Sequence, residues 1–424
     1  MNLEPRMDKL HGAAVLERQF MQRQRILFIL PLFATAMLLS FGRNGFLPFS
    51  SYTPLDQMIN VLIVIAAPLC LLFRPVNFFR HSFLIRILPL IILWIYVAFC
   101  VSGSPKTYWP DHSAVLSIFL AILLASQVSV SQLRMLRLLT LVAGLLFSAF
   151  VLLYGRRELS SILGGTLNQR LGSEISDSLL VAYPRMLYVI AFTCFVSAIA
   201  EKRVWLKIGA IMLAILPVLV ALATGGRGPL VALSCAVLFF LLGLRQRHSS
   251  ILGLLLAASI FCIGYYIVSE YLPVMAQRIG EWDDAGRSIL YEKAWAKISF
   301  FGRGIGDMYA HNIFLEFLQD YGIFGLVLFL ITTIISVGSA ARVYWHTRNV
   351  DVLWVMGLIT LQLVAQMFSL NIYWAMVWGT LALPLGFAPE IVPLPKEYEE
   401  SPHSWRDRKR KDHWLKYLRE GYDK

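Results

Sequence analysis

Residues 321–338 read YGIFGLVLFLITTIISVG and contain no charged side chain. An apolar run of this length can cross the hydrocarbon core of a bilayer as one helix. Similar runs recur along the chain, at 26–42, 55–73, 84–101, 113–129, 138–155, 180–199, 205–223, 229–244, 251–269, 352–370 and 372–388. The sequence therefore predicts an all-α, polytopic membrane protein with about twelve transmembrane helices.

The composition of the 424-residue chain agrees with this class. Hydrophobic residues make up 58% of it, charged residues only 15%, and its mean hydropathy is +0.65. Soluble domains contain roughly a quarter charged residues. The chain has no GxxxxGK[ST] loop, no HExxH, no CxxC and no metal-ligand spacing among its histidines. We therefore expect neither ATP-driven transport nor a bound metal or cofactor.

Lysine and arginine are distributed unevenly between the two predicted sides of the membrane. With the N-terminus in the cytoplasm, most of the 38 Lys and Arg residues fall on the cytoplasmic side, in accord with the positive-inside rule. Both termini are then cytoplasmic, and the basic tail favours membrane lipids over nucleic acid as its partner. The expected segments are a cytoplasmic arm at 1–25, helices 1–9 in 26–269, an extracytoplasmic loop at 270–320, helices 10–12 in 321–388 and a cytoplasmic tail at 389–424.

The large loop at 270–320 contains the segment RSILYEKAWAKISFF, residues 287–301. Its apolar residues recur at helical spacing, which predicts a short helix lying along the membrane surface. The glycines of GRGIG, residues 302–306, are expected to end that helix. The residues that define the spacing are Ile289, Leu290, Ala294, Trp295 and Ile298.

The segment YAHNIFLEFLQDYGIFG, residues 309–325, leads from this loop into the last group of membrane helices. At about 100° per residue, one face of the expected helix carries His311, Leu315, Leu318, Gly322 and Gly325. Glycines on that face would allow close approach by another helix, so we expect His311 to face protein or a cavity. A polar stripe runs beside it, formed by Asn312, Glu316 and Gln319.

Two interpretations of His311 follow from this position. An imidazole at the end of a helix can simply lie at the lipid–water interface. Alternatively, His311 is a general base, because only His112 and His311 fall on the extracytoplasmic side and few other groups there titrate near neutral pH.

Arginines on the extracytoplasmic side are exceptions to the positive-inside bias. Arg227 lies in TGGRGP, residues 224–229, between two predicted membrane helices. An arginine at membrane depth is costly and marks a functional site by default, and a guanidinium suits phosphate oxygens through paired hydrogen bonds. For Arg227, as for Arg287 in the large loop, the alternative is a structural arginine paired with a nearby carboxylate.

A family resemblance joins these elements. The pattern HNx9GxxG, formed by His311, Asn312, Gly322 and Gly325, resembles the signature of O-antigen ligases and related polymerases. QRLG at 169–172 is similar to an Arg-x-Gly element of that superfamily, and TGGRGP to its Ser-Arg-Gly turn, with Gly226 in place of Ser. The stretch from RSILYEKAW to GRGIGDMYAHN is similar to its large-loop pattern. The resemblance covers about two-fifths of the chain.

The resemblance implies a metal-independent, inverting glycosyltransferase in the bacterial inner membrane, with its active site facing the periplasm. The donor would be a glycan on undecaprenyl diphosphate, and the acceptor the lipid A–core oligosaccharide. His311 would deprotonate the acceptor hydroxyl, and Arg227 and Arg287 would hold the diphosphate. Further substrate contacts would come from Arg170, Asn312 and Arg303. The alternatives are a polymerase that joins lipid-linked repeat units, and a transporter of lipid-linked or anionic solutes.

Overall fold

A computed structural model of the chain describes residues 29–41, 65–68, 81–103, 109–154, 177–223, 227–244, 251, 255, 258–259, 262, 266, 269–270, 287–302, 312–368 and 375–387. Within these ranges the secondary structure is helical and contains no strand, which confirms the all-α class. Because helices satisfy every backbone hydrogen bond within one segment, this is a backbone suited to a bilayer.

The described helices follow the apolar runs of the sequence. Ten of the twelve predicted runs coincide with a described helix, and the runs at 55–73 and 251–269 lie largely outside the described residues. The elements are α2 Ile29–Phe41, α5 His81–Gly103, α6 Trp109–Ala125, η1 Val130–Gln132, α7 Leu133–Tyr154, α9 Asp177–Ala200, α10 Val204–Ala223, α11 Arg227–Gly243, α14 Arg287–Trp295, α15 Ile313–Glu316, η2 Phe317–Tyr321, α16 Gly322–Thr347, α17 Val350–Phe368, α18 Ala375–Ala382 and η3 Leu383–Gly386.

Three described segments are long and apolar enough to cross a membrane, namely Phe83–Ser102, Ile313–Thr347 and Val350–Phe368. A fourth is possible if Ile118–Ala125 and Val130–Leu146, which meet at a 95° bend, form one broken span. Four shorter apolar helices accompany them. The transmembrane character predicted from the sequence is therefore present in the described part of the chain.

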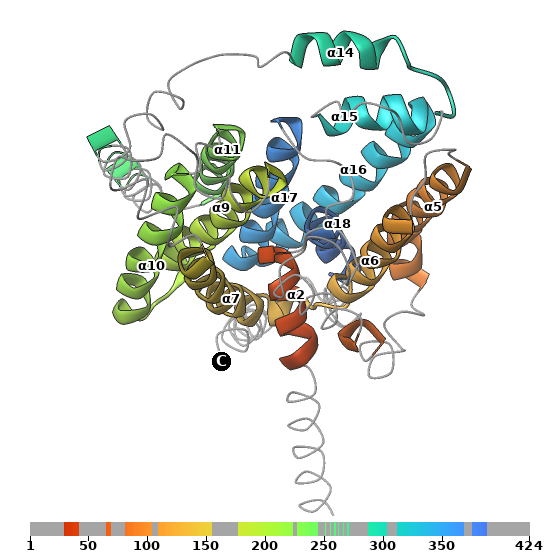
Figure 1. Cartoon of the computed structure of the whole chain (residues 1–424). Coiled ribbons are helices and arrows are strands. Elements are labelled where there is room, and N and C mark those ends of the chain that lie inside the picture. Colours follow the sequence, from red (N-terminus) through yellow and green to blue (C-terminus); the bar gives the residue numbers. More distant parts are fainter. Residues whose placement is uncertain are drawn as a thin grey trace, which may run out of the picture.

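Helix α17 packs antiparallel against α11 near the centre of the bundle (Figure 1). Gly228, at the start of α11, lies against Phe368 at the end of α17. At the other end of the pair, a Cβ on Gly243 would lie 2.6 Å from Leu353. Small residues at both ends let the two backbones approach closely, as in other membrane helix pairs.

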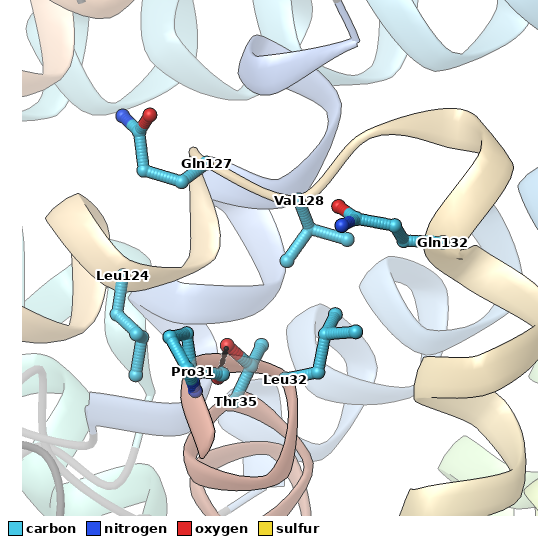
Figure 2. Close-up of a pocket in the computed structure, with 7 residues that line it drawn as sticks. All are labelled: Pro31, Leu32, Thr35, Leu124, Gln127, Val128 and Gln132. Atoms are coloured by element: carbon cyan, nitrogen blue, oxygen red, sulfur yellow. Dashed lines mark hydrogen bonds between the residues drawn. The ribbon is translucent and has the colours of Figure 1, made fainter. Parts of the chain in front are cut away.

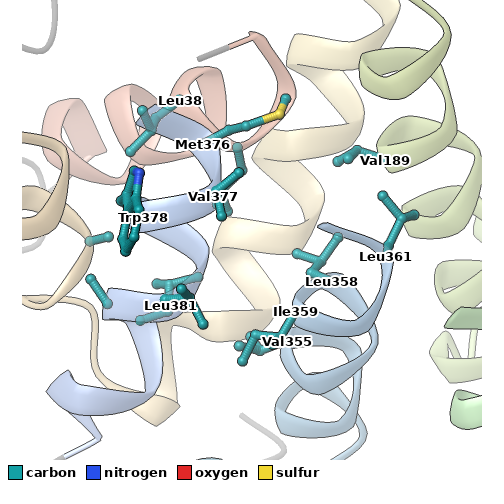
Figure 3. Packing of buried hydrophobic residues seen from close by; sticks show 14 of the residues in the cluster. Leu38, Val189, Val355, Leu358, Ile359, Leu361, Met376, Val377, Trp378 and Leu381 are labelled. Carbon is teal, nitrogen blue, oxygen red and sulfur yellow. The ribbon is translucent and has the colours of Figure 1, made fainter. Parts of the chain in front are cut away.

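The apolar core lies among α2, α9, α17 and α18 (Figure 3). Trp378 of α18 is fully buried and meets Trp94 of α5 edge-on, with ring centroids 4.8 Å apart. Phe317 of η2 stacks on Phe329 of α16 at 4.7 Å, and both rings also contact Trp378. This aromatic cluster fixes the segment that follows His311 to the body of the bundle.

A buried ion cluster ties together one end of α7, α9 and α17. Arg137 donates to Glu201 at 2.8 Å, to Asp351 at 2.6 Å and to Ser197 at 2.5 Å. Arg134 also donates to Glu201, at 2.9 Å. Burial alone would raise the pKa of Glu201, but the hydrogen bonds from the two arginines hold it below its ordinary value. The apolar run at 138–155 predicted a helix that begins after Arg137, whereas α7 already begins at Leu133.

Candidate functional site

The helix expected in the large loop is present as α14, which runs from Arg287 to Trp295 and lies across the end of the bundle (Figure 1). Ala294 is buried and packs with Leu315, and Tyr291 and Leu318 add to this contact. The helix ends three residues before Ile298, earlier than its apolar spacing indicated. Its inner face therefore rests on the segment that follows His311.

Asn312 begins that segment by capping α15. Its side-chain oxygen accepts hydrogen bonds from the backbone N–H groups of Phe314 at 3.0 Å and Leu315 at 3.4 Å. An Asn in this role satisfies two of the N–H groups that a helix start leaves without a helical partner. The side-chain amide also donates to the carbonyl oxygen of Met367 at 3.4 Å. Asn312, which directly follows His311, is thus attached to the end of α17.

Gly322 and Gly302 form a joint between α16 and the connection after α14. Both adopt left-handed backbone angles, with φ of +67° and +73°, and only glycine does so without steric cost. A Cβ on Gly322 would lie 2.5 Å from the carbonyl oxygen of Phe300 and against the backbone of Gly302. Two backbone hydrogen bonds of 3.0 Å close the joint, from Ile323 to Ser299 and from Phe324 to Phe300.

The single helical face predicted for residues 311–325 is wrong in its described part, which begins at Asn312. Residues Phe317–Tyr321 form a π-helical turn, and the backbone then breaks at Gly322. A π turn changes the number of residues per turn, so Leu318 and Gly322 are not related by a spacing of 100° per residue. Gly322 serves a backbone joint, while Gly325 lies against the side chains of Tyr321 and Tyr96.

Tyr96 of α5 holds the same joint from the side. Its hydroxyl is within hydrogen-bonding distance of the carbonyl oxygen of Phe301 and lies 3.0 Å from that of Tyr321. Its ring meets Phe324 edge-on, with centroids 5.0 Å apart. No motif in the sequence pointed to Tyr96, because it lies more than two hundred residues from both carbonyls.

The polar stripe predicted beside His311 is largely buried. Glu316 and Gln319 are less than one-tenth exposed, as is Asp320, which accepts a hydrogen bond from Gln319 at 3.0 Å. Polar groups withdrawn from water need hydrogen-bonding partners. Their burial shows that the described part of this segment points polar side chains into protein. The orientation predicted for His311 itself lies outside the described residues.

The site residues predicted from the sequence are described to different extents. His311, Arg170 and Arg303 lie outside the described residues. The backbones of Arg227 and Arg287 are described, and each is the first residue of a helix, α11 and α14 respectively. Asn312 is described in full and bonds to backbone groups of this chain.

The end of α17 brings two of these neighbourhoods together. Met367 accepts the hydrogen bond from Asn312, which directly follows His311. The next residue, Phe368, lies against Gly228, which directly follows Arg227. Residues adjacent to His311 and to Arg227 therefore contact two consecutive residues of one helix, although they are separated by more than eighty positions in the sequence.

A hollow between α2, α6 and η1 lies elsewhere in the bundle (Figure 2). Its lining includes Gln127 and Gln132 together with apolar residues of α2, and it leaves no room for a water-sized molecule. Thr35 donates to the carbonyl oxygen of Pro31 at 2.8 Å within it. The hollow is a packing gap, and it does not contain any of the predicted site residues.

Neither a protein-family model nor a curated protein matches the chain.

The glycine joint gives a first testable prediction. We expect Gly322→Ala to lower the free energy of unfolding by about 1–3 kcal/mol, because alanine is disfavoured at positive φ and its methyl group meets the backbone of 299–302. Gly338 is the matched control, since a Cβ there meets nothing within 4 Å. Thermal unfolding of the two purified variants in detergent is the measurement. Equal stability of both variants would contradict the joint.

Proposed function

We propose that the chain is an O-antigen ligase, which transfers a glycan from undecaprenyl diphosphate to the lipid A–core oligosaccharide on the periplasmic face of the bacterial inner membrane. The observation that carries the proposal is the convergence at Met367 and Phe368, where the neighbours of His311 and of Arg227 meet. A base and a phosphate-binding arginine have to lie on one side of the membrane to act on one lipid-linked donor.

The groups bound at the two ends of α17 support a periplasmic position for the Asn312 end. The Arg137 cluster bonds to Asp351 at one end of α17, and Asn312 bonds to Met367 at the other. The two positions lie sixteen residues apart, which is about 24 Å along a helix and close to the thickness of a bilayer core. The positive-inside rule assigns the Arg137 end to the cytoplasm, so the Asn312 end faces the periplasm.

The starts of α11 and α14 suit a diphosphate. The N-terminus of a helix presents free backbone N–H groups and the positive end of the helix dipole, both of which favour anions. Arg227 and Arg287 occupy the first position of these helices. An arginine there adds a paired donor that suits phosphate oxygens.

These residues support a simple reaction. The acceptor hydroxyl loses its proton to the imidazole of His311 and attacks the anomeric carbon of the first donor sugar. The bond from that carbon to the diphosphate oxygen breaks, and the configuration inverts. Arg227 and Arg287 neutralise the charge that develops on the leaving undecaprenyl diphosphate. Arg170 and Arg303 add contacts to the substrate.

A polymerase is the second candidate, because it shares the donor and much of the motif. The compact chain, with one large loop between its ninth and tenth predicted spans, favours the ligase. A transporter of anionic solutes would use the arginines for binding only. That function gives no role to His311, which directly precedes the residue that caps α15.

The proposal is tested with purified protein, a polyprenyl-diphosphate glycan donor and two acceptors, lipid A–core oligosaccharide and lipid-linked repeat unit. We expect transfer to the first acceptor, at an unchanged rate in EDTA, because the arginines replace a metal in charge neutralisation. Product is measured by the mobility shift of the glycosylated acceptor. Transfer only to the repeat unit would establish the polymerase, and no transfer to either would reject both.

A further inference from the structure

Four aromatic rings form a chain across α5 and α16 at the level of the glycine joint. Phe300 meets Phe301 edge-on at 4.7 Å between centroids, and Phe301 lies 6.0 Å from Phe324. Phe324 in turn meets Tyr96 at 5.0 Å. Phe300 and Phe301 remain 58% and 63% exposed, although each is held in place by the joint. Exposed aromatic side chains thus project from a backbone that is hydrogen-bonded to the start of α16.

These rings continue two stripes of exposed apolar residues, one on the first half of α16 and one on α5. The outward residues of α16 are Ile323, Val327, Leu330, Ile331 and Ile334. Those of α5 are Ile85, Leu88, Ile92, Ile95 and Phe99. Both helices are long and apolar enough to cross a membrane, so each stripe is a surface for acyl chains. Ile323 bonds through its backbone to Ser299, which places Phe300 and Phe301 at the end of the α16 stripe.

The residues just before Phe300 include an exposed tryptophan and two lysines, as is typical of a segment at a lipid headgroup region. Trp295, at the end of α14, is 59% exposed. On the same short stretch Lys293 and Glu292 are exposed and Lys297 is half-buried. Tryptophan and tyrosine collect at the headgroup level of membranes, and lysine reaches from there to lipid phosphates. A protein partner would not require this gradation from acyl-facing to phosphate-facing groups.

We propose that Phe300, Phe301 and Ile323 form an interfacial anchor, inserted among the lipids at the boundary between acyl chains and headgroups. The anchor sets the depth of the connection between α14 and α16. Because Gly302 follows Phe301 directly and packs against the backbone of Gly322, the anchor also sets the depth of Gly302. For the proposed function this is the level of a lipid-linked diphosphate, although the anchor itself does not rest on that function.

The anchor is tested by spin labelling in a background in which the native cysteines are replaced by alanine. Labels are placed at Phe301→Cys and, as the matched control, at Glu292→Cys on the exposed side of α14. Each protein is reconstituted in vesicles of phosphatidylcholine and phosphatidylglycerol. Collision with oxygen, which concentrates in acyl chains, is compared with collision with a water-soluble nickel chelate.

We expect the ratio of oxygen to nickel collisions to be several-fold higher at Phe301 than at Glu292. Equal ratios at the two positions would show that Phe301 lies no deeper among the acyl chains than an exposed position on α14, and would overturn the proposal. A label at Phe301 that neither reagent reaches would also overturn it, because protein, such as a second copy of the chain, would then cover the patch. A label at Phe300→Cys gives the same comparison if the first variant does not fold. The collision ratios do not depend on whether the protein transfers glycan, so failure of the proposed function would leave this test unchanged.

Discussion

Replacing His311 with alanine is expected to lower the rate of glycan transfer by about 10²–10⁴-fold, the usual contribution of a positioned general base. Without the imidazole, the acceptor hydroxyl has to attack while still protonated, or lose its proton to water. The neighbouring Asn312 caps α15 through its own side chain and bonds to Met367. Removing the imidazole therefore leaves the described attachments of this segment in place, and the variant should fold normally.

The measurement is initial rate with the lipid A–core acceptor, alongside the elution profile and thermal unfolding of the variant. His346→Ala is the matched control, because His346 is exposed and lies in the last turn of α16, far along the chain from the segment that Asn312 begins. Transfer by the His311 variant within a few-fold of the unaltered protein would remove His311 from the role of base. That result would not bear on the roles proposed for Arg227 and Arg287 or on the fold.

Much of the fold could be predicted because it depends on local composition. A run such as 352–370 has to become a helix in a bilayer, since no other local structure satisfies its backbone groups there. The structure places α17 at Val350–Phe368, within two residues of that run. The start of α7 was less predictable, because polar residues such as Arg134 and Arg137 extend this helix beyond its apolar part.

The arrangement of the site depends on contacts that no local pattern contains. Asn312 directly before an apolar helix is a recognisable capping signal, and its role could have been predicted from the sequence. The π turn at Phe317–Tyr321 could not, because it is stabilised by rings from α16 and α18. The partners of Arg137 lie 60, 64 and 214 residues away from it. Likewise the role of Gly322 depends on its contact with Gly302, which lies twenty residues earlier in the sequence.

Replacing Arg137 with methionine is expected to lower the free energy of unfolding by about 3–5 kcal/mol, the range found when one member of a buried ion pair is removed. The side chains of Arg137 and Glu201 are each 2% exposed, so neither can regain hydration without local opening. The variant leaves Asp351 and Ser197 without the guanidinium that now joins them. Three helices therefore lose their common tie at the end opposite to Asn312.

Arg134→Met is the matched control for that experiment. Arg134 bonds to the same carboxylate at 2.9 Å, but its side chain is 52% exposed, and ion pairs in contact with water contribute only about 0–1 kcal/mol. Thermal unfolding in detergent should then separate the two variants clearly. The double variant Arg137→Met and Glu201→Met should recover part of the lost stability, because it removes a buried carboxylate that would keep only the half-exposed Arg134 as its partner. Equal effects of the two single variants would show that the buried arginine is not the tie, and that apolar packing among α7, α9 and α17 alone holds this end of the bundle.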